Sequence, residues 1–164
     1  MKTIAQKTLM RFIISISLIV IGTSFYLQYL RGMEPCPLCL MQRLCVIFIL
    51  ILGILNLAIP KLIRNKKIVI SQLFFGIIGF YFAARQLWLV SLPHDQIPAC
   101  VPGLTILIHY FPWKDVAHAL FWGSGDCTEI TWSWLGISLP MWAAIYFVTI
   151  ISANIAVLRE MRQK

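Results

Sequence analysis

The chain has 164 residues, of which 60% are hydrophobic and 12% are charged. A soluble domain normally carries about twice this charged fraction, so the composition excludes an ordinary soluble globular protein. The net charge of +8 is compatible with nucleic-acid binding. The basic residues flank long apolar runs, however, and this placement indicates membrane topology instead.

Four apolar runs predict an all-α membrane protein, a four-helix transmembrane bundle with spans at about residues 11–30, 42–60, 68–88 and 139–158. Charged residues are absent from 12–30, 44–60, 68–84 and 130–158. A helix needs roughly 20 residues to cross a hydrocarbon layer of about 30 Å, and flanking side chains can extend slightly shorter runs. The first run is longer than the apolar core of a secretory signal, about 7–15 residues, so we expect an uncleaved span.

The distribution of basic residues predicts that both termini are cytoplasmic. Three groups lie on one side of the predicted spans: Lys2, Lys7 and Arg11; Lys61, Arg64, Lys66 and Lys67; and Arg159, Arg162 and Lys164. Only Arg31, Arg43, Arg85 and Lys114 fall on the other side. Cytoplasmic loops carry the excess of Lys and Arg, and the six tryptophans fall at or near the opposite interface.

We expect one membrane domain, residues 1–164, with non-cytoplasmic loops at about 31–41 and 91–137. The prolines that open the longer loop argue against regular helix there. Residues 114–122 then place their apolar side chains on one helical face, which predicts a short helix lying on the membrane surface. The segment Gly123-Ser124-Gly125 follows, and its glycines predict flexibility.

Four of the five cysteines, Cys36, Cys39, Cys100 and Cys127, fall on the oxidising side of this topology, whereas Cys45 lies inside the second span as a small buried hydrophobe. The four could form structural disulfides, bind zinc or exchange electrons. A disulfide closing the short Cys36–Cys39 loop would contribute only about 2 kcal/mol, against about 3.5 kcal/mol for a loop from Cys100 to Cys127. The Cys-x-x-Cys spacing favours a dithiol that opens and closes, and zinc sites usually take two tight cysteine pairs.

The surroundings of these cysteines also favour thiol exchange. Cys39 is predicted near a helix N-terminus, which stabilises a thiolate, and Arg43 follows one helical turn later. Ionisable residues at such membrane depth tend to be functional, so we interpret Arg43 as a partner for a thiolate and an anionic acceptor. Cys100 lies between prolines, in an extended stretch suited to a partner's groove. Cys127 follows the glycines, and we expect it to be mobile.

Several motifs together resemble the DsbB family of bacterial disulfide bond formation proteins. Cys36-Pro-Leu-Cys39 followed by Gln42-Arg43 is similar to the family's active motif. Similarity continues in the second loop and last helix, at Gly123-Ser-Gly-Asp-Cys127-Thr-Glu, Trp132, Leu135-Gly136 and Pro140-Met-Trp142. The resemblance covers essentially the whole chain, in matching order and spacing.

This resemblance implies an inner-membrane enzyme that reoxidises a periplasmic DsbA-like thiol oxidase, with ubiquinone or menaquinone as electron acceptor. It also implies two redox-active pairs, Cys36–Cys39 and Cys100–Cys127. Cys100 would take the attack of the reduced partner, Cys127 would pass electrons to Cys36, and Cys39 would face the quinone beside Arg43.

One departure from the family concerns a histidine that some members carry near the end of the third helix. Arg85-Gln86 occupies that place here, while His94, His109 and His118 fall in the second loop, where we expect solvated side chains. Two rival functions remain open from the sequence. One is a non-enzymatic membrane protein with structural disulfides, and the other is a zinc or redox sensor.

Overall fold

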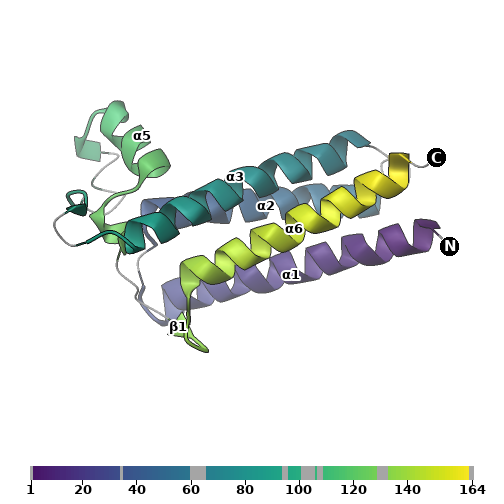
Figure 1. Cartoon of the computed structure of the whole chain (residues 1–164), viewed down its shortest axis with the longest axis horizontal. Coiled ribbons are helices and arrows are strands. Elements are labelled where there is room, and N and C mark those ends of the chain that lie inside the picture. The colour runs from purple at the N-terminus through teal and green to yellow at the C-terminus, as the bar shows by residue number, and fades with distance from the viewer. Residues whose placement is uncertain are drawn as a thin grey trace.

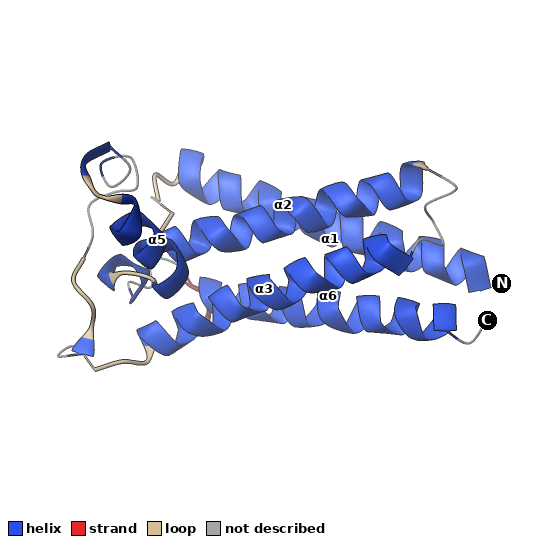
Figure 2. Ribbon diagram, turned by 90° about the horizontal axis from the view of Figure 1, so that it is seen from above, coloured by secondary structure: helices blue, strands red, loops and turns tan. Residues whose placement is uncertain are grey.

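The chain forms a bundle of four long helices, α1 (Lys2–Leu30), α2 (Pro37–Ala58), α3 (Lys66–Val90) and α6 (Leu139–Arg162). The computed structural model describes residues 2–33, 35–59, 66–93, 96–100, 106, 109–128 and 133–162. Both termini lie at one end of the bundle, and the long loop between α3 and α6 covers the other end (Figures 1 and 2). Each long helix is apolar and long enough to cross a membrane, so the four-helix membrane fold predicted from the sequence is confirmed.

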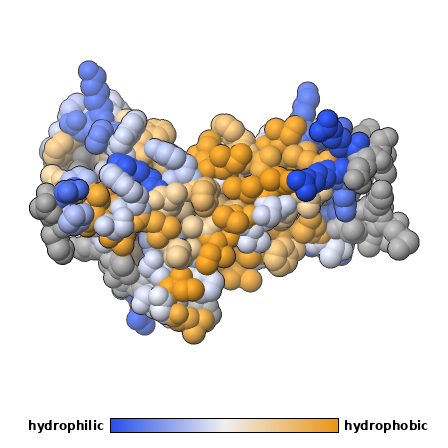
Figure 3. All heavy atoms as spheres, in the orientation of Figure 1, coloured by the Kyte–Doolittle hydropathy of each residue, from blue (hydrophilic) through white to orange (hydrophobic). Residues whose placement is uncertain are grey.

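The face of the bundle seen in Figure 3 is apolar in its middle and polar at its two ends. Large hydrophobic side chains on all four helices remain exposed, among them Leu18, Ile19, Phe48, Phe74, Ile77 and Val148. Water would disfavour so large an apolar band, whereas lipid chains would cover it. The chain is therefore a multi-pass membrane protein.

The interior is closely packed where α3 meets α6. A Cβ atom added at Gly76 would lie 3.3 Å from Ile151 Cγ1, and one added at Gly79 would collide with the Phe147 ring. Small residues let membrane helices approach closely, because van der Waals packing rather than water exclusion holds them together. The buried faces of the four helices thus form one core that continues up to the loop end of the bundle.

The long loop contains short elements of its own. Helix α5 (Trp113–Trp122) occupies the place where residues 114–122 predict a helix, and its location on a membrane surface stays a prediction. The 3-10 helix η2 (Gly125–Thr128) follows. A two-residue hairpin, β1 (Ser133–Trp134) and β2 (Ile137–Ser138), was not predicted from the sequence. Leu135 and Gly136 form its turn with positive φ angles of 56° and 76°, as a type I′ hairpin loop requires.

Candidate functional site

The first pair of cysteines lies at the N-terminus of α2, at the loop end of the bundle. Cys36 and Cys39 form a disulfide. Cys36 caps the helix, because its extended backbone precedes Pro37 in the first turn and its sulfur accepts a hydrogen bond from the Cys39 N–H at 3.3 Å. Proline suits this position because a first-turn N–H has no partner within the helix. The α2 N-terminus thus holds both sulfurs in a fixed place.

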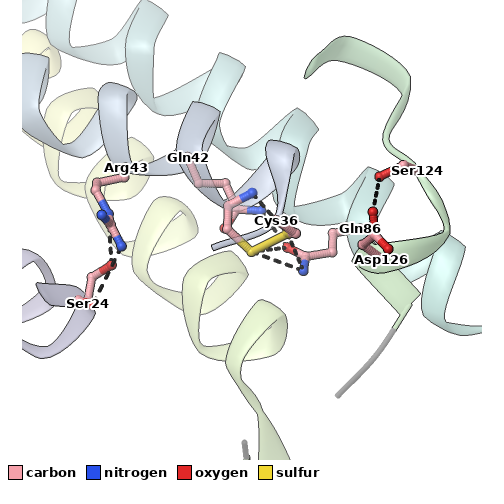
Figure 4. The surroundings of a disulfide bond; sticks show 8 residues. Ser24, Cys36, Gln42, Arg43, Gln86, Ser124 and Asp126 are labelled. Atoms are coloured by element: carbon pink, nitrogen blue, oxygen red, sulfur yellow. Dashed lines mark hydrogen bonds between the residues drawn. A yellow bond between two sulfur atoms is a disulfide. The ribbon is translucent and has the colours of Figure 1, made fainter. Parts of the chain in front are cut away.

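Two glutamines surround this disulfide in a buried polar cluster. Gln86 of α3 directs Nε2 toward Cys36 Sγ at 3.5 Å and Cys39 Sγ at 3.3 Å (Figure 4). Its Oε1 accepts a hydrogen bond of 2.9 Å from Nε2 of Gln42, which lies on α2. Only 5% of Gln86 and 7% of Gln42 is exposed, so these amides act in a medium of low polarity.

Cys127 lies in the core, and residues 123–125, for which the sequence predicts flexibility, are buried as well. Cys127 is 1% exposed and belongs to the same buried cluster as Leu38 and Leu89, against which Cys36 also packs. Gly123 has a φ of +83°, and a Cβ atom there would stand 2.6 Å from Leu89 and 2.7 Å from Leu38. The glycines therefore allow close packing over the α2 N-terminus.

Cys100 lies on the exposed part of the loop beside η2. The Gly125 N–H donates to the Ala99 carbonyl at 3.3 Å, and a Cβ atom at Gly125 would lie 2.9 Å from Cys100 Sγ. The chain around Cys100 thus runs directly past the segment that carries Cys127. The pairing of Cys100 with Cys127 as a disulfide stays a prediction.

Arg43 lies one turn after Cys39 but points toward α1 rather than toward the disulfide (Figure 4). Its Nε donates to Ser24 Oγ at 3.0 Å and its Nη1 donates to Gln28 Oε1 at 2.5 Å. The guanidinium also lies 4.8 Å from the centre of the Phe25 ring. The structure thus does not place the Arg43 side chain beside Cys39, because α1 offers it several acceptors.

An open cavity of about 300 Å³ adjoins this arginine through Gln28. Gln28, Tyr29, Gly32, Met33 and Pro35 line it, between the end of α1 and the segment that leads to Cys36. The described partners of Arg43 are all neutral, so its charge stays available to an anion or a polarised oxygen near this cavity.

Arg85, which lies where some family members carry a histidine, links α5 to α3. Its Nε donates to the Trp122 carbonyl at 3.2 Å, and its guanidinium lies 4.1 Å from the centre of the Trp88 ring. A cation at the last carbonyls of a helix is favourable. His118 stacks on Trp122, and His94 lies outside the described residues. Cys45 is buried on α2, in agreement with its interpretation as a small hydrophobe.

The roles of Gln42 and Gln86 were not predicted from the sequence. The sequence does contain a signal for these two residues. Burying an uncharged polar side chain inside an apolar span costs free energy unless it forms hydrogen bonds, and such residues are often functional. The partners lie 44 positions apart, so only the packing of α3 against α2 reveals the cluster. No group of three potential metal ligands lies together in the described part of the chain.

Comparisons with known proteins agree with this arrangement. The family model described as "Disulfide bond formation protein DsbB" matches residues 6–157. A disulfide bond formation protein B from Hahella chejuensis is 39% identical over 135 residues, 79% of each chain. The proteins of that name from Marinobacter nauticus and Stutzerimonas stutzeri are 35% and 33% identical, over 85% and 80% of this chain and 83% and 82% of theirs.

The match extends over nearly the whole chain and covers α2, α3, most of α1 and α6, the Cys36–Cys39 disulfide and the segment that carries Cys127. The chain therefore belongs to the DsbB family of disulfide bond formation proteins.

Proposed function

We propose that this protein reoxidises a DsbA-like periplasmic thiol oxidase and passes the electrons through two cysteine pairs to a membrane quinone. The observation that carries the proposal is the Cys36–Cys39 disulfide at the loop end of a membrane bundle, in contact with the buried cluster that holds Cys127. This position lies between a soluble protein donor and an acceptor dissolved in lipid. The fold would sit in the bacterial inner membrane with its cysteine loops in the periplasm.

The electron route begins at the exposed Cys100. A thiolate of the partner attacks Cys100, the Cys100–Cys127 bond breaks, and the electron pair leaves on the Cys127 sulfur. The Cys127 thiolate then attacks Cys36, the Cys36–Cys39 bond breaks, and Cys39 receives the pair. The partner's second thiol and Cys100 resolve the two mixed disulfides, which releases the oxidised partner, restores Cys100–Cys127 and leaves Cys36 and Cys39 reduced.

A quinone would accept two electrons and two protons and so restore the Cys36–Cys39 disulfide. An acceptor of this kind is needed because DsbA-type oxidants have a potential of about −120 mV, against about −200 mV for glutathione-like couples. At about 30 mV per factor of ten, reoxidation by glutathione would be unfavourable by roughly five-hundredfold. Arg43 would bind the quinone through its charge, next to the open cavity that Gln28 lines.

Turnover with purified components tests this function. The protein in detergent, mixed with a reduced DsbA-like oxidase, should consume ubiquinone or menaquinone, and comparing the two would identify the acceptor. Cys36→Ser and Cys39→Ser should each abolish turnover, because either change removes the disulfide. Cys45→Ser is the matched control, since Cys45 lies on the same helix outside the proposed route, and it should keep most of the activity.

The order of the cysteines can be tested with the oxidised partner in place of the reduced one. The Cys100 thiolate of Cys127→Ala should attack the disulfide of that partner and form a mixed disulfide, visible as a larger species on a non-reducing gel. A mixed disulfide that forms with Cys100→Ala and not with Cys127→Ala would reverse the proposed order. Unchanged quinone consumption by Cys36→Ser would remove the function itself and favour a structural role for the disulfides.

A further inference from the structure

The Gln86 amide faces the disulfide with its nitrogen rather than its oxygen. Nε2 lies 3.5 Å from Cys36 Sγ and 3.3 Å from Cys39 Sγ, whereas Oε1 lies further from Cys39 Sγ, at 3.6 Å. Oε1 is already engaged by Gln42 Nε2 at 2.9 Å (Figure 4). The hydrogen bond from Gln42 therefore fixes which end of the Gln86 amide meets the sulfurs.

Disulfide sulfur is a weak acceptor, so these contacts contribute little while the bond is intact. When the Cys36–Cys39 bond breaks, one sulfur receives an electron pair and becomes a thiolate. Hydrogen bonds to a charged acceptor are about twice as strong as those between neutral groups. Burial strengthens them further, and an interaction that grows as charge develops lowers the barrier of the step.

We propose that Gln86 is a catalytic hydrogen-bond donor to the thiolate formed from the Cys36–Cys39 disulfide, and that Gln42 is a positioning residue acting through Gln86. This inference rests on the proposed function. In the step concerned, the Cys127 thiolate attacks Cys36 Sγ, the Cys127–Cys36 bond forms, the Cys36–Cys39 bond breaks, and the electron pair moves to Cys39 Sγ. No proton moves in this step, and Nε2 of Gln86 is in place to donate to the new thiolate.

A neutral amide suits this position better than a cation. A buried cation would carry a large desolvation cost throughout the cycle, whereas an amide held in place by a second amide presents its dipole without that cost. The side chain of Arg43 cannot supply the donor in this arrangement, because its guanidinium is bonded to Ser24 and Gln28 on α1. The thiolate is thus stabilised by Gln86 and by the N-terminus of α2.

The test measures how fast the two thiols react with iodoacetamide as a function of pH. The protein carries Cys45→Ala, Cys100→Ala and Cys127→Ala, is fully reduced, and is analysed by peptide mapping so that Cys36 and Cys39 are followed separately. Gln86→Met keeps the length of the side chain and removes the donor. We expect its Cys39 profile to move about one unit to higher pH and the rate near neutrality to fall several-fold, while the plateau at high pH does not fall, because a less stabilised thiolate is more nucleophilic.

Substitution of Gln42 provides a second measurement in the same assay. Gln42→Met should shift the profile by a smaller amount, because Gln86 keeps its donor but loses the bond that orients it. In the Gln86→Met background, Gln42→Met should add no further shift, since Gln42 acts only through Gln86. Gln86→Asn, whose amide is too short to reach the sulfurs, replaces Gln86→Met if that variant does not fold.

Gln72→Met is the matched control. Gln72 lies on the same helix, is also fully buried, and donates to the Ile49 carbonyl at 3.1 Å, about 21 Å along the helix from Gln86. This variant should leave the pH profile in place even if it lowers the thermal stability. A Gln86→Met profile that overlies the parent profile, or an equal shift with Gln72→Met, would overturn the inference. The assay contains no quinone, so its result is independent of whether the parent protein consumes quinone.

Discussion

Arg43 is the arginine that lies nearest in sequence to the disulfide, and its geometry links α2 to α1. Hydrogen bonds to Ser24 and Gln28 hold the guanidinium, and the Phe25 ring lies against it. These partners orient the charge without neutralising it. The arginine therefore has two separable effects, a structural one on the α1–α2 contact and an electrostatic one on any group that enters the adjoining cavity.

Arg43→Met should separate these effects. We expect the KM for quinone to rise tenfold or more, because a charge-assisted contact contributes about 1.5–3 kcal/mol, while the rate at which Cys127 reduces Cys36–Cys39 stays near that of the parent. Steady-state turnover against quinone concentration measures the first quantity, and stopped-flow mixing with the reduced partner measures the second.

Arg31→Met is the control for Arg43→Met, because Arg31 is an exposed cation at the same end of the bundle. It should leave the KM for quinone within about twofold of the parent value. An equal rise in KM for both variants would mean that general surface charge, rather than Arg43, attracts the acceptor.

For single residues, the sequence predicts those features that depend only on neighbours along the chain. Cys36, Pro37 and Cys39 are adjacent, so their spacing indicates a disulfide at a helix start, and the structure has one there. The direction of the Arg43 side chain could not be predicted, because it depends on acceptors about 15 to 19 residues away on α1. The same holds for Gln86, whose contact with the disulfide requires the packing of α3 on α2.

Among the elements, the segment 123–128 packs the long loop between α3 and α6 against the end of the helix bundle. Gly123 is buried under the side chains of Leu38 and Leu89, and η2 then directs Cys127 into the core. The sequence predicts flexibility at these glycines, but glycine permits both flexibility and close approach, and the sequence does not distinguish the two. The contacts of Gly123 with α2 and α3 show the close approach.

Gly123→Ala should detach this segment. The added methyl group would collide with Leu38 and Leu89, and the φ of +83° adds a backbone cost of about 1–2 kcal/mol. We expect electron transfer from Cys127 to the Cys36–Cys39 disulfide to slow by at least tenfold, and Cys127 to become open to alkylation, while the four-helix bundle keeps its circular dichroism spectrum.

Gly32→Ala separates the steric effect from the backbone effect. Gly32 also has a positive φ, +66°, but a Cβ atom there would have no neighbour within 4 Å. This variant should carry only the backbone cost and leave Cys127 protected. Alkylation of Cys127 at the parent rate in Gly123→Ala would contradict the packing argument.

For the whole molecule, the arrangement of helices follows from features that the sequence displays over long stretches. The apolar runs and the exposed hydrophobic band describe the same four helices. The helices nevertheless extend beyond the predicted spans, because capping and the first polar turn continue the helix outside the apolar core. Thus α2 begins at Pro37 rather than at residue 42, and α1 begins at Lys2 rather than at residue 11.

Both termini lie at one end of the bundle, together with Lys7, Arg11, Lys66, Lys67, Arg159 and Arg162. The positive-inside rule predicts that this end faces the cytoplasm. Labelling with a membrane-impermeant maleimide tests the orientation of the full chain. In an otherwise cysteine-free protein, Cys100 should react in spheroplasts, whereas Lys7→Cys, at an exposed position on α1, should react only after the membrane is permeabilised. The reverse pattern would invert the proposed topology.

The difference in exposure between Cys100 and Cys127 determines which of the two sulfurs a donor can attack in the first exchange step. In a Cys100–Cys127 disulfide, a bulky thiol donor could reach only the outer sulfur, because Cys127 is 1% exposed within the core. Attack on the outer sulfur would release the inner one beside Cys36. Attack on the inner sulfur would instead leave the donor attached to Cys127, and Cys127 could not attack Cys36 until the second thiol of the donor had resolved that adduct. Burial of one sulfur would thus direct the first exchange to the route that frees Cys127 at once.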